Sequence, residues 1–249
     1  MRYVLANWKM YPTVDQARQL FVAIQDGLRD RADAGAVLPR PIVCPPFVAL
    51  APLRAVADDR LARLGAQNCH WQQEGAYTGE VSPRMLRGLA EYVMVGHSER
   101  RAAGETDDQV AGKVAAVAHA GLVPILFVGE DRPSDDAWAC TAARLRHGLS
   151  QVDVGRQRIL VVYEPAWAIG AEHAAGAGQV GGVVEQVKAL LRDRGATGPE
   201  VLYGGTVNEG NIEAFAALDV LDGVGATRAS LDAGRFLGLV DRLAGLARR

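Results

Sequence analysis

The sequence predicts an α/β protein, namely a single domain built as one (β/α)8 barrel over residues 1–249. Apolar, β-rich runs alternate with helical patterns from one end of the chain to the other. The length of 249 residues suits one barrel or two smaller domains. No Ser/Pro-rich linker or block of charge divides the chain, which favours the single barrel.

Eight short runs of β-favouring residues are the predicted strands. Each precedes a segment with helical character, so we expect parallel strands joined by right-handed helical crossovers. Eight such units use up the chain and can close into a barrel. The strands are expected at residues 3–6, 42–44, 63–66, 92–95, 123–128, 159–163, 201–203 and 221–224.

Two capping boxes mark helix starts. Thr13 pairs with Gln16, and Thr106 pairs with Gln109. Apolar residues at helical spacing follow each box, as expected for helices that lie on a sheet. The predicted buried faces comprise Ala17, Leu20, Phe21, Ile24 and Leu28, then Val110, Val114 and Val117, and, after the sixth strand, Val180, Val183, Val184, Val187 and Leu191.

Composition narrows the possible partners. A formal net charge of -2 and a pI near 6.2 provide no basic stripe, so no nucleic acid partner is expected. The N-terminal stretch lacks the apolar core of a signal peptide, and no apolar run is long enough to cross a bilayer, so we expect a cytoplasmic protein without a membrane partner. Cys44, Cys69 and Cys140 form no C-x-x-C pair, which indicates core or surface thiols rather than a disulfide framework or a metal site.

The connection at residues 67–82 is longer than a compact fold usually contains without a purpose. It carries Cys69, Trp71 and Tyr77, whose apolar surface is costly in water and suits a subunit interface. We therefore expect this loop to reach a partner subunit. The alternative is an arm folded on its own barrel.

Four dissimilar polar side chains follow predicted strands. Asn7 and Lys9 follow the first strand, His97 the fourth and Glu164 the sixth. The C-terminal ends of barrel strands converge on one mouth, so these groups should meet. Apolar neighbours should raise the pKa of Glu164, and the positive end of the helix expected after His97 should keep that imidazole neutral.

A carboxylate base, a neutral imidazole and an ammonium around one cavity suit the transfer of a proton between adjacent carbons beside a carbonyl. This chemistry is an enolisation. Glu164 would take the carbon-bound proton, while His97 and Lys9 would stabilise the enediolate oxyanion.

A phosphate site is indicated by Y-G-G-T at residues 203–206. A strand ending in Gly204, Gly205 and Thr206 could cradle an anion with backbone N–H groups, and Gly170 offers another such group. Residues 165–176 form a plausible lid that excludes water, which would prevent an enediolate phosphate from losing its phosphate.

Six motifs occur in one order along the chain: N-W-K, G-A-Y-T-G-E, V-G-H-S-E-R-R, V-G-E, Y-E-P-A-W-A-I-G and Y-G-G-T-V. In this order they resemble the triosephosphate isomerase family over nearly the whole chain. The resemblance implies a TIM barrel that interconverts dihydroxyacetone phosphate and glyceraldehyde 3-phosphate. It also implies a homodimer, a small phosphorylated sugar as substrate, and no cofactor or metal.

The same resemblance implies roles for particular residues. Glu164 would be the base, His97 the electrophile and Lys9 the substrate-binding cation, with Asn7 in support. Thr78, beside Tyr77, would stand at the tip of the arm that reaches the neighbouring subunit.

The chain departs from the family in four places, one of which is the segment after H-S-E-R-R, which is one residue short. Thr227 and Arg228 stand where the family has a glycine pair whose amides bind phosphate. A Cβ there costs about 1 kcal/mol or more if the phosphate needs a positive φ, whereas the Arg228 guanidinium could grip phosphate directly. Glu172 in the lid would weaken the binding of an anion, and Phe127 replaces a usual cysteine behind the base.

Three other hypotheses stay open. His70 with Trp71, and an arginine after the eighth strand, resemble family members that isomerise four-carbon ketose phosphates such as L-erythrulose 1-phosphate. The altered phosphate loop also permits a non-catalytic phosphate-binding barrel. Residues 176–181 spell G-x-G-x-x-G, as in dinucleotide-binding oxidoreductases, but they do not directly leave a strand.

Overall fold

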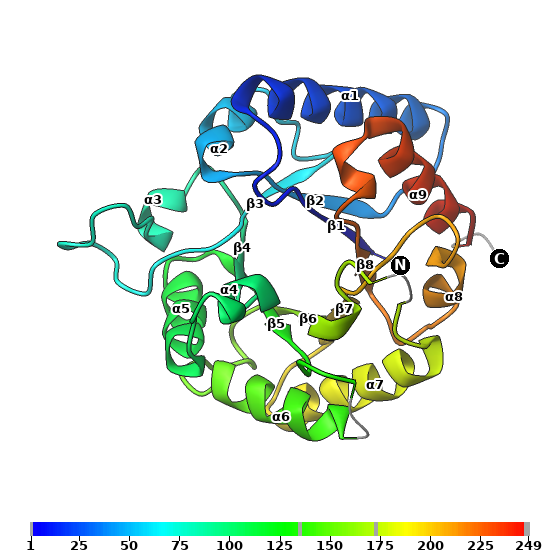
Figure 1. Cartoon of the computed structure of the whole chain (residues 1–249). Coiled ribbons are helices and arrows are strands. Elements are labelled where there is room, and N and C mark those ends of the chain that lie inside the picture. The colour runs from blue at the N-terminus through cyan, green and yellow to red at the C-terminus, as the bar shows by residue number, and fades with distance from the viewer. Residues whose placement is uncertain (1, 134–135, 172–173, 247–249) are drawn as a thin grey trace.

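The computed structural model describes residues 2–133, 136–171 and 174–246. Within this part of the chain, eight parallel strands close into a barrel in sequence order, with β8 returning to pair with β1 (Figure 1). The predicted barrel fold is confirmed. The strands are β1 Tyr3–Asn7, β2 Arg40–Cys44, β3 Arg63–Ala66, β4 Tyr92–Val95, β5 Val123–Val128, β6 Leu160–Tyr163, β7 Glu200–Tyr203 and β8 Gly223–Gly225.

Helices surround the barrel, as Figure 1 shows along its axis. The α-helices of the described residues are α1 Val14–Asp33, α2 Phe47–Arg54, α3 Pro83–Leu86, α4 Ser98–Ala102, α5 Asp107–His119, α6 Ala137–Gly148, α7 Ala177–Asp193, α8 Ile212–Ala216 and α9 Ala233–Leu246. Two short 3-10 helices, η1 Ala166–Ala168 and η2 Ala229–Leu231, follow β6 and β8.

The last strand differs from its prediction. It was expected at residues 221–224 and is observed at Gly223–Gly225. The reason is that the Asp222 carbonyl accepts hydrogen bonds from the N–H groups of Arg2 and Tyr3, which ends the preceding connection. The ladder with β1 therefore begins at Gly223, two residues after the predicted start. The sixth strand likewise begins at Leu160, one residue after its predicted start.

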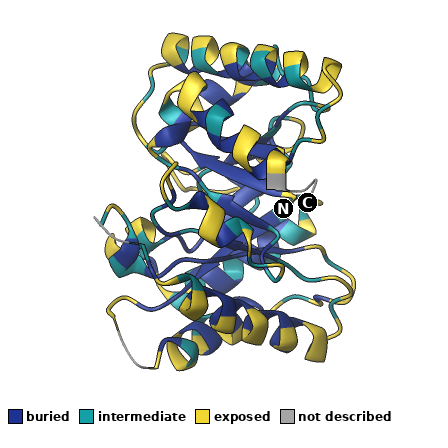
Figure 2. Cartoon of the chain, turned by 90° about the vertical axis from the view of Figure 1, so that its right-hand side faces the viewer, coloured by how far each residue is buried: buried dark blue, intermediate teal, exposed yellow. Residues whose placement is uncertain are grey.

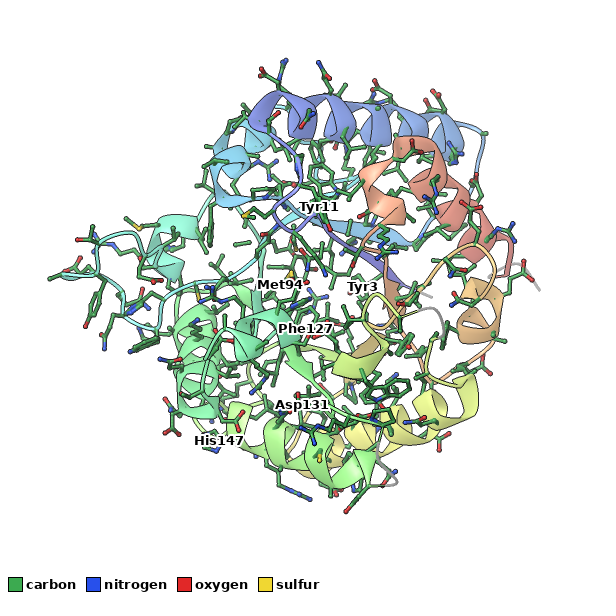
Figure 3. All side chains as sticks on the ribbon, viewed as in Figure 1. Tyr3, Tyr11, Met94, Phe127, Asp131 and His147 are labelled. Atoms are coloured by element: carbon green, nitrogen blue, oxygen red, sulfur yellow. The ribbon has the colours of Figure 1, made fainter. Side chains whose placement is uncertain are left out.

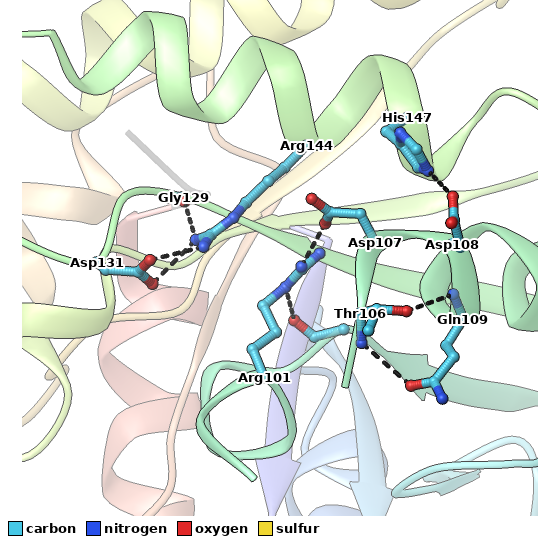
Figure 4. Close-up of polar contacts among 10 residues, drawn as sticks. Arg101, Thr106, Asp107, Asp108, Gln109, Gly129, Asp131, Arg144 and His147 are labelled. Atoms are coloured by element: carbon cyan, nitrogen blue, oxygen red, sulfur yellow. Dashed lines mark hydrogen bonds and ion pairs between the residues drawn. The ribbon is translucent and has the colours of Figure 1, made fainter. Parts of the chain in front are cut away.

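Both capping boxes are present, and Figure 4 shows the one formed by Thr106 and Gln109. The predicted apolar faces are buried, except that Leu20 is only partly covered. Burial is concentrated on the strands and on the inward faces of the helices, while the outward faces are exposed (Figure 2). The spacing of apolar residues in the sequence therefore matches the spacing of buried residues along the helices.

Successive residues of each strand belong to two different apolar layers, one inside the barrel and one between the barrel and the helices. Tyr3 and Leu5 of β1 point into the barrel, while Val4 and Ala6 pack against the surrounding helices. Figure 3 places Tyr3 near the centre of the ring of strands, together with other side chains of the interior cluster. The barrel is thus a packed core, and functional groups must gather at one of its ends.

The connection at residues 67–82 extends away from the barrel between β3 and α3 (Figure 1). At its base, the buried Lys113 amine donates a hydrogen bond to Asn68 Oδ1 at 2.9 Å and forms an ion pair with Glu105. Trp71 and Tyr77 are 36% and 45% exposed. The loop therefore projects outward with aromatic surface in contact with solvent, rather than folding onto its own barrel.

All three cysteines are free thiols, with Cys44 and Cys69 buried and Cys140 exposed, as predicted. Among the described residues, no helix combines the length and apolar character needed to span a bilayer.

Candidate active site

Three strand ends bring the predicted site residues to one end of the barrel. Asn7 ends β1, His97 follows β4 and Glu164 follows β6. Lys9, two residues beyond β1, has φ 48 and is the one non-glycine residue with a positive φ in the described chain. Such a backbone conformation is costly and must be held by its surroundings.

Two amide side chains hold the strained Lys9 backbone. Asn7 Oδ1 accepts a hydrogen bond from the Lys9 N–H at 3.0 Å, and Gln67 Nε2 donates to the Lys9 carbonyl at 2.8 Å. Gln67 also donates to the Cys44 carbonyl at 2.9 Å, which ties the Lys9 turn to the end of β2. The sequence analysis assigned no role to Gln67, because its target is a backbone atom far away in sequence.

The Lys9 amine forms an ion pair with Glu99, with 2.5 Å between Nζ and Oε1. Glu99 lies in the first turn of α4, one residue after Ser98. Its other carboxylate oxygen lies 3.9 Å from His97 Nδ1. Glu99 therefore contacts the ammonium group through its carboxylate and the imidazole through its backbone N–H, a role that was not predicted although the motif H-S-E-R-R contains the residue.

His97 caps the N-terminus of α4. Its Nδ1 accepts a hydrogen bond from the Glu99 N–H at 3.2 Å, which requires Nδ1 to be unprotonated and leaves the proton on Nε2. Nε2 lies 3.1 Å from Glu164 Oε1 and 3.4 Å from Asn7 Nδ2. Phe127 meets the imidazole in an edge-to-face contact, with 5.0 Å between ring centroids. The geometry agrees with the neutral imidazole expected from the sequence.

Glu164 is buried, and its second carboxylate oxygen accepts a hydrogen bond from the Ser98 N–H at 2.8 Å. Burial raises the pKa of Glu164 above its ordinary value and outweighs the opposing effects of His97 and Ser98. The raised pKa predicted from the apolar neighbours is confirmed. Gly129, in the motif V-G-E, is needed here, because a Cβ at this position would lie 2.2 Å from the Glu164 carbonyl oxygen.

The segment after Glu164 is fastened at several points. Trp167 Nε1 and the Tyr163 hydroxyl donate to the buried Glu130 carboxylate, at 2.9 and 3.2 Å. Further along, the Ala175 N–H donates to the Tyr203 hydroxyl at 3.1 Å. The described part of the lid thus rests on β5, β6 and β7. Residues 172–173 lie outside the described chain, so the expected effect of Glu172 stays a prediction.

A cavity of about 540 Å³ opens beside Lys9. All the predicted phosphate-binding residues line it, namely Gly170, Gly204, Gly205, Thr206, Thr227 and Arg228. Lys9 and Glu99 contribute to the same wall, Tyr11 lies at its exposed rim, and Arg235 adds a cation that the sequence analysis did not select. Figure 3 marks the position of Tyr11 between β1 and α1.

Two of the predicted phosphate-binding residues, Gly204 and Thr206, have acceptors within the chain. Gly204 N–H donates to the Tyr163 carbonyl at 2.8 Å, and both the N–H and the hydroxyl of Thr206 donate to the Ala168 carbonyl. In this structure these donors hold the lid and the strand ends, so the binding of phosphate by Gly204 and Thr206 stays a prediction. The reason is that residue 204 continues the β6–β7 contact and Thr206 lies under η1.

Other amides at the cavity have no hydrogen-bond acceptor among the described residues. They include the amides of Gly170, Gly205, Thr227 and Arg228. Gly205 must be glycine, because a Cβ there would lie 2.0 Å from the Tyr203 hydroxyl oxygen. These four backbone donors are therefore free to bind solvent or a ligand.

The structure resolves the concern about side chains in place of a glycine pair. Arg228 has φ -65 and ψ -42, an ordinary right-handed conformation, and Thr227 is not among the residues with positive φ. Neither Cβ is strained. Arg228 Nη2 lies 3.8 Å from the point that a Cβ on Gly170 would occupy, so the guanidinium stands beside the lid.

Tyr77 and Thr78 lie in the outward loop and are not brought to this cavity in the single chain. His70 stacks on Trp71, with ring centroids 4.1 Å apart, and meets Tyr77 in a tilted arrangement at 4.3 Å. The G-x-G-x-x-G stretch at 176–181 begins as the N-cap of α7 and follows the lid, so it lacks the strand-to-helix turn of a dinucleotide site.

A closed parallel barrel with a buried carboxylate, an imidazole and an ammonium at one end defines the class of (β/α)8-barrel isomerases. The comparisons with known proteins identify the family within this class. The triosephosphate isomerase family model matches residues 2–243. The chain belongs to the triosephosphate isomerase family.

Several relatives cover almost the whole chain. Triosephosphate isomerase of Dehalococcoides mccartyi (strain CBDB1) is 37% identical over 243 residues, which cover 95% of this chain and 94% of the relative. Triosephosphate isomerase of Roseiflexus castenholzii is 39% identical over 247 residues, with 94% of each chain covered. The crystal structure of triosephosphate isomerase from Bartonella henselae superposes with a TM-score of 0.85 at 29% identity, covering 100% of this chain and 99% of the other.

Proposed function

We propose that the protein interconverts dihydroxyacetone phosphate and glyceraldehyde 3-phosphate by proton transfer through an enediolate. The observation that carries the proposal is the contact between His97 Nε2 and Glu164 Oε1 at 3.1 Å, with the Lys9 ammonium joined to His97 through Glu99. This arrangement supplies a base, a hydrogen-bond donor and a positive charge within one site. Membership of an isomerase family supports the same reaction.

In the first step, a Glu164 carboxylate oxygen removes a proton from C1 of dihydroxyacetone phosphate. The C–H electron pair forms the C1–C2 double bond, and the C2 carbonyl oxygen takes the negative charge. His97 Nε2–H and the Lys9 ammonium stabilise that oxygen. The second step returns a proton from Glu164 to C2, while the proton of the C1 hydroxyl passes to the negatively charged C2 oxygen, so that C1 becomes the aldehyde and C2 carries the hydroxyl. No net oxidant is needed, because C1 is oxidised as C2 is reduced.

Burial of Glu164 supports its role as the base. A raised pKa makes the carboxylate a stronger base than an exposed glutamate. In the structure, both Glu164 oxygens already have partners, since Ser98 N–H binds one and His97 the other. The carboxylate must exchange one of these contacts for the substrate proton. Asn7 acts in support by holding the Lys9 backbone and contacting His97.

The phosphate of the substrate is proposed to bind the unpaired amides of Gly170, Gly205, Thr227 and Arg228, together with the Arg228 guanidinium. Because the loop after β8 carries side chains without backbone strain, it can use both kinds of donor. Gly204 and Thr206 hold the lid instead, through their bonds to Tyr163 and Ala168.

A homodimer is proposed from exposed apolar side chains that follow neighbouring strands. Met10 is 95% exposed after β1, and Val48 is 70% exposed after β2. Trp71 and Tyr77 on the arm and Met85 on α3 continue this set after β3. Apolar surface of this kind suits an interface. Thr78 would then stand at the tip of an arm that enters the partner subunit.

We further propose that residues 1–249 form one domain, because one closed barrel contains strands from both ends of the chain and α9 packs beside α1. A cytoplasmic location, and the absence of any metal or cofactor requirement, remain predictions. Free thiols on Cys44, Cys69 and Cys140 are in keeping with a reducing compartment.

The proposed reaction is tested by turnover of glyceraldehyde 3-phosphate and dihydroxyacetone phosphate in coupled assays, with L-erythrulose 1-phosphate as the competing substrate. We expect efficient turnover of the triose phosphates. Negligible kcat/KM for the trioses with good turnover of the tetrulose would overturn the proposal, and inertness towards both would favour a non-catalytic barrel. The relatives named triosephosphate isomerase do not favour either alternative.

A further inference from the structure

Two arginine side chains share the cavity with Lys9. Arg228 lies just before η2, beside Gly170 of the lid. Arg235 lies in the first turn of α9, where Asp232 Oδ1 accepts a hydrogen bond from its N–H at 2.8 Å. The Ser230 hydroxyl donates to the Thr227 carbonyl at 2.7 Å, which fixes the turn between the two arginines. Both side chains therefore arise from one ordered segment after β8.

The charges in this cavity are unbalanced. The Lys9 ammonium is matched by Glu99 at 2.5 Å. The Arg228 guanidinium forms no ion pair or hydrogen bond with the described residues, and Arg235 has one long ion pair, with 3.7 Å between its Nε and Glu209 Oε1. An unpaired guanidinium at a cavity is a ready ligand for an anion, since its planar N–H groups match two phosphate oxygens.

We propose that Arg235 is a second substrate-binding residue, and that Arg228 and Arg235 together hold the dianionic phosphate of the substrate as a two-guanidinium clamp. The inference rests on the proposed function and deepens it, because it adds a second guanidinium group, that of Arg235, to the proposed phosphate site of backbone amides and Arg228. A phosphate monoester carries close to two negative charges at neutral pH, which the two guanidinium groups neutralise.

The clamp predicts an effect of salt on phosphate binding that would not occur if Arg235 had only a structural role. Two partly exposed charges that bind a dianion are screened by salt, so the affinity for phosphate should fall as ionic strength rises. Removing either arginine should reduce that salt dependence as well as the affinity. A residue that only caps or packs α9 would change stability and leave the salt dependence intact.

The test measures binding of inorganic phosphate by ³¹P NMR titration, and kcat and KM for glyceraldehyde 3-phosphate, in wild type, Arg228→Gln, Arg235→Gln and the double variant. Arg242→Gln is the matched control, because Arg242 lies on the same helix and pairs with Glu213 away from the cavity. Arg235→Lys tests rescue by a retained charge. Thermal unfolding of each variant confirms that it is folded.

We expect Arg235→Gln to weaken phosphate binding and raise KM by about three- to fivefold, the range for a half-exposed charge pair. Arg228→Gln should have a larger effect, about tenfold or more. Arg235→Lys should recover part of the loss, and Arg242→Gln should match wild type. A folded Arg235→Gln variant with unchanged phosphate affinity, KM and salt dependence would overturn the clamp.

The two proposals can fail separately. Wild type that binds phosphate through Arg235 but isomerises no triose phosphate would sink the proposed reaction and keep the clamp. If wild type isomerises triose phosphates and Arg235→Gln cannot be distinguished from it, the proposed reaction stands and the clamp is overturned. Wild type that binds no inorganic phosphate would count against the clamp.

Discussion

The Nε2 atom of His97 lies 3.1 Å from Oε1 of Glu164, and the two residues are 67 positions apart in sequence. A hydrogen bond from the Glu99 N–H fixes the imidazole on one side, and a hydrogen bond from the Ser98 N–H fixes the carboxylate. Both donors belong to the first turn of α4. One short helix therefore positions the two groups that the proposed reaction needs.

Gln67 is predicted to position Lys9. Gln67→Ala removes the hydrogen bonds to the carbonyls of Lys9 and Cys44, so the strained Lys9 backbone should relax and carry its amine out of place. We expect kcat/KM to fall about tenfold, in line with the loss of two neutral hydrogen bonds. Steady-state kinetics provide the measurement. Gln186→Ala is the control, since the Gln186 side chain donates to the Gly182 carbonyl on the exposed face of its own helix; an equal loss in both variants would refute this role.

Trp167 is predicted to hold the start of the lid closed. Trp167→Phe keeps most of the ring but removes the N–H that donates to Glu130. The lid should then open more often, and the enediolate phosphate should lose phosphate to water. We expect inorganic phosphate release per isomerisation to rise several-fold, about the effect of one hydrogen bond. Trp138→Phe on α6 serves as control, and unchanged phosphate release in Trp167→Phe would contradict the lid assignment.

Arg158 is predicted to stabilise the opposite end of the barrel. It donates to the Tyr3 hydroxyl at 2.6 Å and to Glu200 at 2.9 Å, and its guanidinium lies 5.7 Å from the Tyr92 ring centre. Arg158→Ala should lower the free energy of unfolding by about 1–2 kcal/mol, a value reduced for partial exposure.

Activity should be unaffected by the Arg158 substitution, because this network lies at the barrel end away from the site. Chemical denaturation and steady-state kinetics measure the two effects. Arg156→Ala, whose side chain is 87% exposed, is the matched control and should change neither. A loss of activity in Arg158→Ala without a loss of stability would contradict this division of roles.

The raised pKa of Glu164 predicts a pH-dependent stability difference. The folded protein holds the Glu164 proton more tightly than the unfolded chain, so stability falls as pH rises from the unfolded to the folded pKa. Glu164→Gln removes this penalty. Thermal unfolding should show the variant more stable than wild type at pH 7.5 and no advantage near pH 3, where Glu164 is protonated in both states. A constant difference at both pH values would disprove the shift.

Much of this molecule could be predicted from its sequence, because local signals agree with the fold. One such signal is the capping box of Thr106 and Gln109, seen in Figure 4, which depends on residues three positions apart. Another is the spacing of valines in α5 and α7, which matches the buried face of each helix. The eighth strand was misplaced because Asp222 bonds to the start of β1, a contact between distant parts of the chain.

The chemical groups of the site could be predicted from the sequence, but several of the contacts that hold them could not. Lys9, His97 and Glu164 stood out because each follows a strand. Gln67 and Glu99 did not, since their partners are fixed only by folding. Figure 4 shows the same limit away from the site, where Arg144 binds both the Gly129 carbonyl and Asp131 across a loop.

The phosphate end illustrates a second limit. The residue types at 204–206 indicate available amides. Only the folded chain shows that the Gly204 and Thr206 amides donate hydrogen bonds to the carbonyls of Tyr163 and Ala168. The conformation of Arg228 also depends on the turn before η2, and no local pattern in the sequence reports it.

The most direct test of the account follows hydrogen at carbon. Turnover of dihydroxyacetone phosphate in D₂O, analysed by NMR, should place solvent deuterium on C2 of glyceraldehyde 3-phosphate, and Glu164→Gln should slow this incorporation about 10²- to 10⁴-fold while remaining folded. A folded Glu164→Gln variant that forms product and incorporates solvent deuterium at the wild-type rate would contradict proton transfer through Glu164.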